Sequence, residues 1–424
     1  MRSRPLAPFS LLALCCVLGS TSPVRAQGVS FDEAIGLAGA TPVVRAEERA
    51  LEARRTGDAR ISDVTEASRF YAMPGIRALT EQDLGFEGQV QIGHSWNLAG
   101  LADAQRRTAR GEREAREARA RATALSQRLF AARTWMSLRE AEAHLATARD
   151  ALGIAERMLE RTERAAATGV ATRADVAEAQ AYVSESRAAV LAVQGEIVDA
   201  QVDLGAALGR ADVETLSTAG PLPAPPVPDP AEIERRLSDV GHIPEVVAAR
   251  LSATAARARD AEVAAMRGPR LDADVMVYRE SPNGLMIFGQ LGVVLPLADL
   301  AARERAVVQE EAELLDGAAE EAALAWRREA HRIAHEVEHT AAVAASYRTE
   351  LVPSLEALLH ARERQLAAGE TTVLVVLDAT RRLVSARAAL TRAETEHAWA
   401  ATRAWLLLAV RTRGTEAEAR GEGP

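Results

Sequence analysis

The residues of this sequence that could carry chemistry stand together near position 335. His335-Glu336-Val337-Glu338-His339 has the H-E-x-x-H spacing of zinc peptidases, in which two histidines one helical turn apart bind zinc and the glutamate acts as base. His331 extends the series, so that a histidine recurs at every fourth position. Such a stripe could contact a metal ion, which makes metal ions one candidate class of substrate.

Two observations favour a solvated helix face over a zinc site. His335 lies two residues from the apolar positions Ile333 and Val337, which places it about 200° around a helix from them. No third ligand is evident downstream. We therefore expect neither enzymatic activity nor a cofactor or resident metal, and keep His331, His335 and His339 as candidates for a metal contact.

The bulk composition narrows the class of protein. Arg2 and Arg4, an apolar run and an A-x-A-like step at 24–26 predict a secretory signal over residues 1–26. Both cysteines, Cys15 and Cys16, lie in this segment, so the mature chain is expected to contain none. The net charge of −9 argues against nucleic acid as a partner. No later segment has about 18 uncharged apolar residues, which predicts no transmembrane helix but leaves room for short alternating membrane strands.

The elements that must position these residues occur twice, about 200 residues apart. The segment 169–179 and the R-A-A step at Arg187 have counterparts at 369–379 and at Arg387. The period is too long for a solenoid, so we infer a duplicated half-molecule. The predicted organisation is a first repeat at 27–220, a proline-rich linker at 221–230, a second repeat at 231–412 and a disordered tail at 413–424.

Each repeat begins with a short helix and a pair of strands. A capping box at Ser30–Glu33 predicts a helix to about Gly57, and Asp229-Pro230 starts its counterpart. Residues 84–96 alternate between apolar and polar positions, as expected for a strand, and their partner is placed around 61–71. In the second repeat, strands are predicted at 271–278 and 285–297, joined through a turn at 281–284.

Long helices make up the rest of each repeat. Residues 101–167 contain no proline and would span roughly 100 Å as one helix, and Val308 to Val337 carry a coiled-coil-like seam. Gly169 and Gly369 provide tight turns, and Thr172 with Asp175 fits a capping box that starts the returning helix. Each half is therefore expected to contain a long antiparallel helical hairpin. Arg187 and Arg387 are interpreted as solvated rather than ion-paired.

Taken in this order, the features resemble the TolC family of outer-membrane efflux channels. Gly369 followed by Val376-Leu377-Asp378-Ala379 and Leu383 is similar to that family's second hairpin tip, and Gly169-Val170-Ala171-Thr172 with Asp175-Val176 to its first. Pro244-Glu245-Val246, Pro269-Arg270-Leu271 and Val294-Leu295-Pro296-Leu297 are similar to its short helix and to the limits of its strands. The resemblance covers nearly the whole mature chain.

The resemblance implies a mainly α-helical homotrimer with a β-barrel portion. Each protomer would give four strands to one closed twelve-stranded barrel in outer-membrane lipid, and its hairpins would form a hollow periplasmic cylinder. A periplasmic adaptor would join this passive channel to an inner-membrane RND or ABC pump. The implied adaptor contacts are the tip residues Gly169, Val170, Ala171, Thr172, Gly369, Glu370, Thr371 and Thr372.

The resemblance also implies a periplasmic gate at Asp378, whose three copies would form an acidic ring. Family members often carry a second carboxylate three residues earlier, where this chain has Val375. Two other classes stay open: a periplasmic coiled-coil adaptor without a barrel, which would have one hairpin flanked by compact β domains, and the zinc peptidase. The exported substrate, whether drug, metal ion or protein, is not specified by these motifs.

Overall fold

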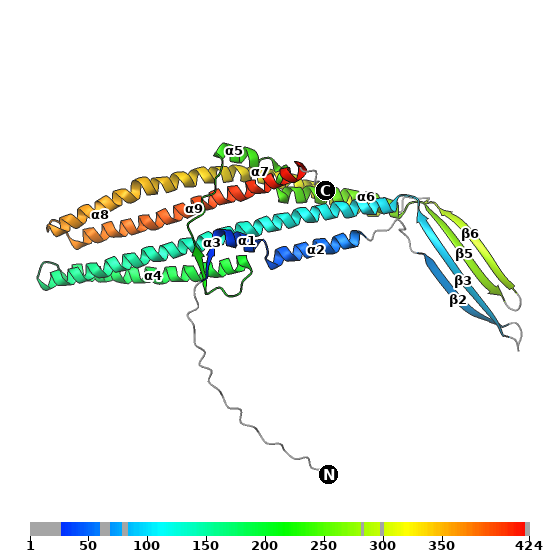
Figure 1. The fold of residues 1–424 in the computed structure, drawn as a ribbon, viewed down its shortest axis with the longest axis horizontal. Helices are drawn as coiled ribbons and strands as arrows, with labels where there is room; N and C mark the ends of the chain where they lie inside the picture. The colour runs from blue at the N-terminus through cyan, green and yellow to red at the C-terminus, as the bar shows by residue number, and fades with distance from the viewer. Residues whose placement is uncertain (1–26, 60–67, 79–83, 281–283, 297–300, 420–424) are drawn as a thin grey trace, which may run out of the picture.

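The computed structural model describes residues 27–59, 68–78, 84–280, 284–296 and 301–419, and the predicted signal at 1–26 lies outside them. The molecule is elongated, with a sheet of long strands at one end and the tips of two helical hairpins at the other (Figure 1). Among the described residues, no helix combines the length and the apolar character that crossing a membrane requires.

The first repeat opens with two helices rather than one. Ser30 caps α1 (Phe31–Ala38), because its side chain accepts a hydrogen bond from the N–H of Glu33 at 3.2 Å. The single helix predicted to Gly57 is wrong, since the chain turns and restarts as α2 (Pro42–Asp58). Pro42 is the cause: it lacks an N–H and holds the preceding Thr41 extended, so it can begin a helix but not continue one.

The first hairpin agrees closely with the sequence. Helix α3 (Leu101–Ala167) runs unbroken for 67 residues, and α4 (Arg173–Leu208) returns along it. Strand β4 (Leu216–Ala219) follows and pairs in parallel with β1 (Gln27–Ser30), a small sheet that the sequence reasoning missed. The indole N–H of Trp135, in the middle of α3, donates to the carbonyl of Val29 at 2.8 Å and so ties this sheet to the hairpin.

The second repeat follows the same plan with one interruption. Residues 221–229 form neither helix nor strand, and Asp229 caps the next helix by accepting from the N–H of Glu232. The helices are α5 (Pro230–Leu237), the short η1 (Val240–His242), α6 (Pro244–Met266), α7 (Ala302–Ser346), the π-helical turn η2 (Tyr347–Leu351), α8 (Val352–Ala367) and α9 (Val373–Ala419). Pro353 explains the break between α7 and α8, because its ring would clash with the carbonyl four residues earlier.

Helix α9 is longer than expected. It continues to Ala419, so the first part of the tail predicted to be disordered from residue 413 is helical. The segment is rich in alanine, glutamate and arginine, which are strong helix formers, and it contains no proline.

One antiparallel sheet joins the two repeats. Its strands are β2 (Arg69–Ala78), β3 (Leu84–Asn97), β5 (Arg270–Glu280) and β6 (Gly284–Val294), in the order β2-β3-β5-β6. The strand predicted around 61–71 is displaced, because β3 pairs with 69–78; residues 61–67 lie outside the described part. Pro74 and Gly75 weaken the alternation of β2, and proline is tolerated there because β2 is an edge strand. Strand β6 ends at Val294, three residues before the predicted end.

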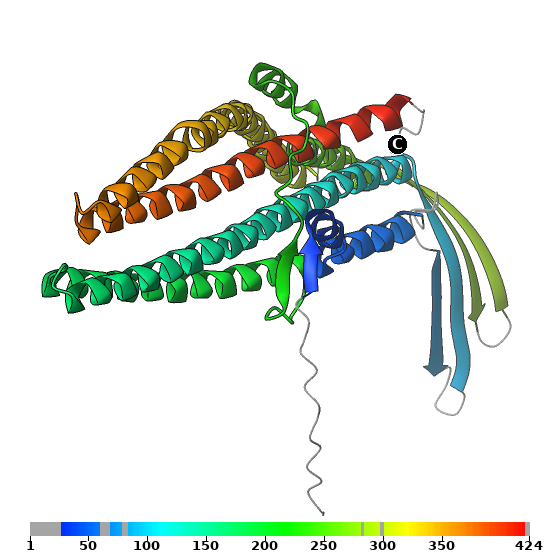
Figure 2. The same ribbon diagram turned by 60° about the vertical axis from the view of Figure 1, so that its left-hand side comes forward.

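The long helices form a row in which the hairpins lie side by side. Helix α3 packs against α4 and α9, and α9 packs against α7 and α8, which places α4 at one margin and α7–α8 at the other (Figures 1 and 2). The predicted seam of the second repeat is inside this row: Val308, Ile333 and Val337 are buried. Alanine dominates the buried positions, so the helices approach closely along their length.

Candidate functional site

The first hairpin tip is built by two local motifs. At the end of α3, Gly169 has φ 79°, its N–H donates to the carbonyl of Ala166 at 3.0 Å, and the N–H of Val170 donates to that of Ala165 at 2.9 Å. This is a Schellman ending, which needs a residue in the left-handed region and therefore favours glycine. Four residues after the glycine, α4 begins.

The predicted capping box at Thr172 and Asp175 is confirmed. The hydroxyl of Thr172 accepts from the N–H of Asp175 at 3.1 Å, and the Asp175 carboxylate accepts from the N–H of Thr172 at 2.8 Å. These bonds from the Thr172 backbone and hydroxyl hold the pKa of Asp175 below its ordinary value. Val170, by contrast, points into solvent with 82% of its surface exposed, which leaves an apolar side chain at the extreme end of the molecule.

The second tip repeats the ending but not the cap. Gly369 has φ 72°, its N–H donates to Leu366 at 3.1 Å, and the N–H of Glu370 donates to Gln365 at 2.9 Å. The position that corresponds to Asp175 is Val375, so no carboxylate can close a capping box with Thr372. The two tips thus share a backbone shape and differ in charge.

A cluster just behind the tips holds the two hairpins together. Apolar side chains of α3, α4 and α9 pack there: Ala155, Met158, Tyr182, Val183, Val376 and Leu377. At its edge, the Arg381 guanidinium donates to Glu178 at 3.3 Å and to Glu185 at 3.0 Å, and it lies 5.0 Å from the centre of the Tyr182 ring. Burial raises the pKa of the Tyr182 hydroxyl. One arginine of the second hairpin therefore binds three side chains of the first.

Asp378 is not part of that cluster. Its carboxylate pairs with Arg382 on the same helix at 2.9 Å, and both side chains are mostly exposed. It lies in the second turn of α9 and so remains available to a surface outside this chain. Arg381, three residues further along, was missed by the sequence reasoning; the available signal was the loss of symmetry, since the corresponding residue of the first repeat is Ala181.

The repeated arginines are ion-paired, so the interpretation that they lack a partner is wrong, although both side chains remain exposed to solvent. Arg187 pairs with Glu156 at 3.1 Å, and Arg387 pairs with Glu356 at 2.7 Å. Both pairs join residues 31 positions apart, across the two arms of a hairpin. The identical separation supports the inferred duplication, although exposed pairs of this kind contribute little to stability.

The histidine stripe lies on the exposed face of α7. The Nδ1 atom of His331 is 3.2 Å from Oε1 of Glu234 on α5, and the rings of His335 and His339 are stacked with their centres 5.7 Å apart. Glu336, which would be the catalytic base of a zinc peptidase, points to the other side, where Arg403 donates a hydrogen bond to it at 3.3 Å. Within the described residues, no three histidine or acidic side chains converge closely enough to hold a metal.

One face of the sheet is mostly apolar, with His94 between Ile92 and Trp96 on β3. Phe70, Ile92 and Val275 are cross-strand neighbours, and Trp96, Leu271 and Val293 form a second row. Several of these side chains are largely exposed, including Phe70 at 70% and Leu291 at 78%. An apolar face of this extent on a sheet is typical of a surface that meets lipid or another protein.

The opposite face of the sheet is polar. The amide of Gln91 donates to Asp274 at 3.1 Å, Ser95 donates to Asp272, and the phenol of Tyr278 donates to Glu87 at 3.3 Å. Gly93 makes this layer possible, because a Cβ there would lie 1.8 Å from a carboxylate oxygen of Asp274. The sheet is therefore amphipathic across its thickness, as the alternation of residues 84–96 predicts.

Comparison with solved structures defines the class of fold. The outer-membrane channel OprN matches with a TM-score of 0.75 at 20% identity, over 89% of this chain and 89% of that chain. The outer-membrane protein VceC from Vibrio cholerae matches with a TM-score of 0.68 at 18% identity, over 89% and 95%. The MtrE outer-membrane channel of Neisseria gonorrhoeae matches with a TM-score of 0.65 at 17% identity, over 92% and 93%. The chain has the fold of outer-membrane channel proteins.

A family model gives a second comparison over part of the chain. Residues 86–210 match the family model described as outer membrane efflux protein, which confirms the resemblance that the sequence motifs predict. The matched segment runs from β3 through the first hairpin and so includes the tip at Gly169. No curated protein matches the sequence significantly.

Proposed function

We propose that this protein is the outer-membrane exit duct of a tripartite efflux or secretion system, with its helical portion in the periplasm. The observation that carries the proposal is the difference between the two ends of the molecule. One end is an amphipathic sheet, and at the other end the tips of two long hairpins lie together. In this role the protein is a passive conduit, and an inner-membrane pump of the RND or ABC class supplies the energy.

The sheet supports a shared β-barrel in the outer membrane. Strands β2 and β6 are its two edges, and an edge exposed to lipid would leave backbone N–H and C=O groups without partners. Three protomers that joined β6 of one to β2 of the next would close twelve strands and remove every edge. The apolar face would then meet lipid, and the Gln91–Asp274 layer would face the lumen.

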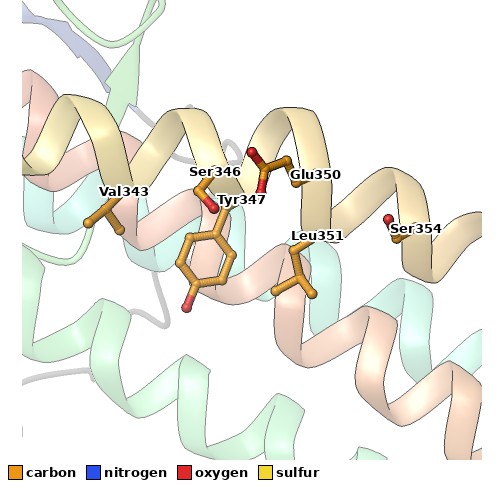
Figure 3. Close-up of a pocket in the computed structure, with 6 residues that line it drawn as sticks. All are labelled: Val343, Ser346, Tyr347, Glu350, Leu351 and Ser354. Atoms are coloured by element: carbon orange, nitrogen blue, oxygen red, sulfur yellow. The ribbon is translucent and has the colours of Figure 1, made fainter.

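The two margins of the helical row support the same arrangement of three protomers around one axis. Helix α4 carries a heptad stripe of small and apolar residues, all exposed: Ala177, Ala181, Ser184, Ala188, Leu191, Gly195, Val198 and Val202. On the other margin, α7, η2 and α8 form an open groove of about 560 Å³ (Figure 3). Its lining residues are Val343, Ser346, Tyr347, Glu350, Leu351 and Ser354. Two different faces that meet across copies form a heterologous contact, and such a contact closes into a ring of three when each copy is rotated by 120° relative to the next.

The tips are the proposed contact for the periplasmic adaptor. Both are exposed turns with free apolar or polar side chains, in particular Val170 and Glu370. Asp378, which is exposed and lies close behind the second tip, is proposed to face the lumen at the periplasmic mouth and to form a ring of three carboxylates. The periplasmic adaptor without a barrel is the alternative class; the four-stranded sheet and the second hairpin count against it.

The first test is the mass of the protein extracted from the outer-membrane fraction in mild detergent, measured by light scattering with the detergent contribution subtracted. We expect three protomers. A monomer released without detergent would overturn the proposed duct and favour the adaptor. The Ile92→Arg variant described below, which places a charge on the apolar face of the sheet, is the matched test of membrane insertion.

A further inference from the structure

We propose that His335 and His339 form a surface site for a divalent transition-metal ion. Residues four apart on a helix have Cβ atoms about 5–6 Å apart, which allows two imidazoles to bind one ion. Here the two rings already lie on the same side of α7, stacked at 5.7 Å with planes inclined by 17°. This arrangement goes beyond the duct function and is independent of it.

The surroundings leave both rings free to bind. Within the described part of the chain, no hydrogen-bond partner is found for His335 or His339, and both side chains are exposed. The neighbouring charges are occupied elsewhere: Glu336 is bound by Arg403, and Arg332 pairs with Glu329. Two charged side chains share the exposed side with the rings: the Glu338 carboxylate, which favours a bound cation, and Arg332, whose guanidinium is paired with Glu329.

His331 is not a third ligand of the same ion. It lies two helical turns, about 12 Å, from His339, and its Nδ1 is engaged by Glu234 at 3.2 Å. The site therefore supplies two nitrogens, and water or a second molecule completes the coordination. Imidazole ligands suit Cu²⁺, Ni²⁺ and Zn²⁺, and for a given nitrogen site Cu²⁺ binds most tightly of these ions.

The test is to titrate the untagged, full-length protein in detergent with Cu²⁺. Calorimetry measures the affinity, and electron paramagnetic resonance reports the ligands of the bound ion. We expect one tight site per protomer with two nitrogen ligands. Either His335→Ala or His339→Ala should weaken Cu²⁺ binding at least tenfold, while His360→Ala, which removes an exposed histidine from α8, should leave it unchanged.

A variant with the same number of histidines at a different spacing tests whether binding requires both rings to hold one ion or only requires histidines to be present. His339→Ala combined with Ala342→His moves the second ring to i+7, on the same face but about 10 Å away, and should bind as weakly as the single variants. Because protons compete with the ion for both imidazoles, Cu²⁺ affinity should be lower at pH 5.5 than at pH 7.5. Equal Cu²⁺ affinity in the wild type and the His335→Ala/His339→Ala double variant would overturn the proposal.

Discussion

At the scale of single residues, Arg381 and its neighbour Arg382 offer a matched pair. Arg381 joins the hairpins through Glu178, Glu185 and Tyr182, whereas Arg382 contacts only Asp378 of its own helix in the described structure. We expect Arg381→Ala to reduce the local stability of the tip region by about 1–2 kcal/mol, because it removes two charged hydrogen bonds that are partly exposed.

Hydrogen exchange of the amides in α4 and α9 near the tips measures this effect. Arg382→Ala should change the local free energy of opening, as measured by this exchange, by less than about 0.5 kcal/mol, as expected for an exposed pair within one helix. If the two variants exchange alike, the packing of the apolar cluster, rather than Arg381, holds the hairpins together.

The difference between the two tips can be tested by a gain of stability. Val375→Asp would place a carboxylate where Asp175 closes the capping box of the first tip. We expect the substitution to stabilise the start of α9 by about 0.5–1 kcal/mol, seen as two- to fivefold slower amide exchange there. Val375→Asn has similar size without the charge and should give a smaller gain. Unchanged exchange in Val375→Asp would show that Thr372 cannot adopt the capping conformation.

The same pair of tips predicts a pH dependence. The pKa of Asp175 is lowered by its bonds to Thr172, so the capping contribution is present above the ordinary carboxyl pKa, near 3.9, and is lost as the pH falls through the lower folded value. We expect the first tip to fray below about pH 4, whereas the second tip, with Val375 at the matching position, has no capping carboxylate to protonate. Amide exchange corrected for the intrinsic effect of pH measures the difference, and Asp175→Asn should remove it.

The residue scale is also where sequence reasoning found least. The turn glycines and the Thr172 cap depend on local backbone geometry, which sequence patterns report directly. Arg381 of the second hairpin contacts Glu185 of the first, which is 196 positions away in the sequence. No local pattern encodes such a contact. The ion pairs of Arg187 and Arg387 were misjudged for the same reason, because pairing depends on the stagger of two helices.

At the scale of elements, prolines and glycines marked most boundaries correctly. The absence of proline from 101–167 predicted an unbroken helix, and α3 has those bounds. Pro42 and Pro353 were the signals that would have split the first helix and interrupted the second hairpin. Strand β2 was misplaced because an edge strand with Pro74 and Gly75 lacks the alternation by which its partner β3 is recognised.

The amphipathic sheet gives a prediction at the same scale, with adjacent residues as test and control. Ile92→Arg places a charge on the apolar face of the central strand β3, and in lipid we expect it to cost about 2–4 kcal/mol near the middle of the membrane. Gln91→Arg places the same charge on the polar face, where the guanidinium can form an ion pair with the Asp274 carboxylate. The fraction of protein recovered in the outer membrane should fall for Ile92→Arg and not for Gln91→Arg. Equal recovery would mean that this face does not meet lipid.

At the scale of the whole molecule, the proposed trimer and the inferred duplication together predict a register between copies. If three protomers share an axis along the hairpins, their tips lie at one level. Leu191 is 22 residues beyond Gly169, and Tyr347 is 22 residues before Gly369, so both lie about 33 Å from the tips. By the same count, Gly195 is level with Val343, and Ser184 is level with Ser354. The stripe of α4 thus sets small residues and Leu191 against the groove of Figure 3.

This register can be tested by cross-linking, because the only native cysteines are Cys15 and Cys16 of the predicted signal. We expect Leu191→Cys with Tyr347→Cys to give covalent dimers and trimers on mild oxidation, since two cysteines bridge only when their Cα atoms lie within about 7 Å. In one protomer α4 and α7–α8 occupy opposite margins of the row, so the bridge requires a second copy. Ala192→Cys with Tyr347→Cys, turned about 100° off the stripe, should stay monomeric on denaturing gels. Cross-linking of the control pair alone would place a different face of α4 in the interface.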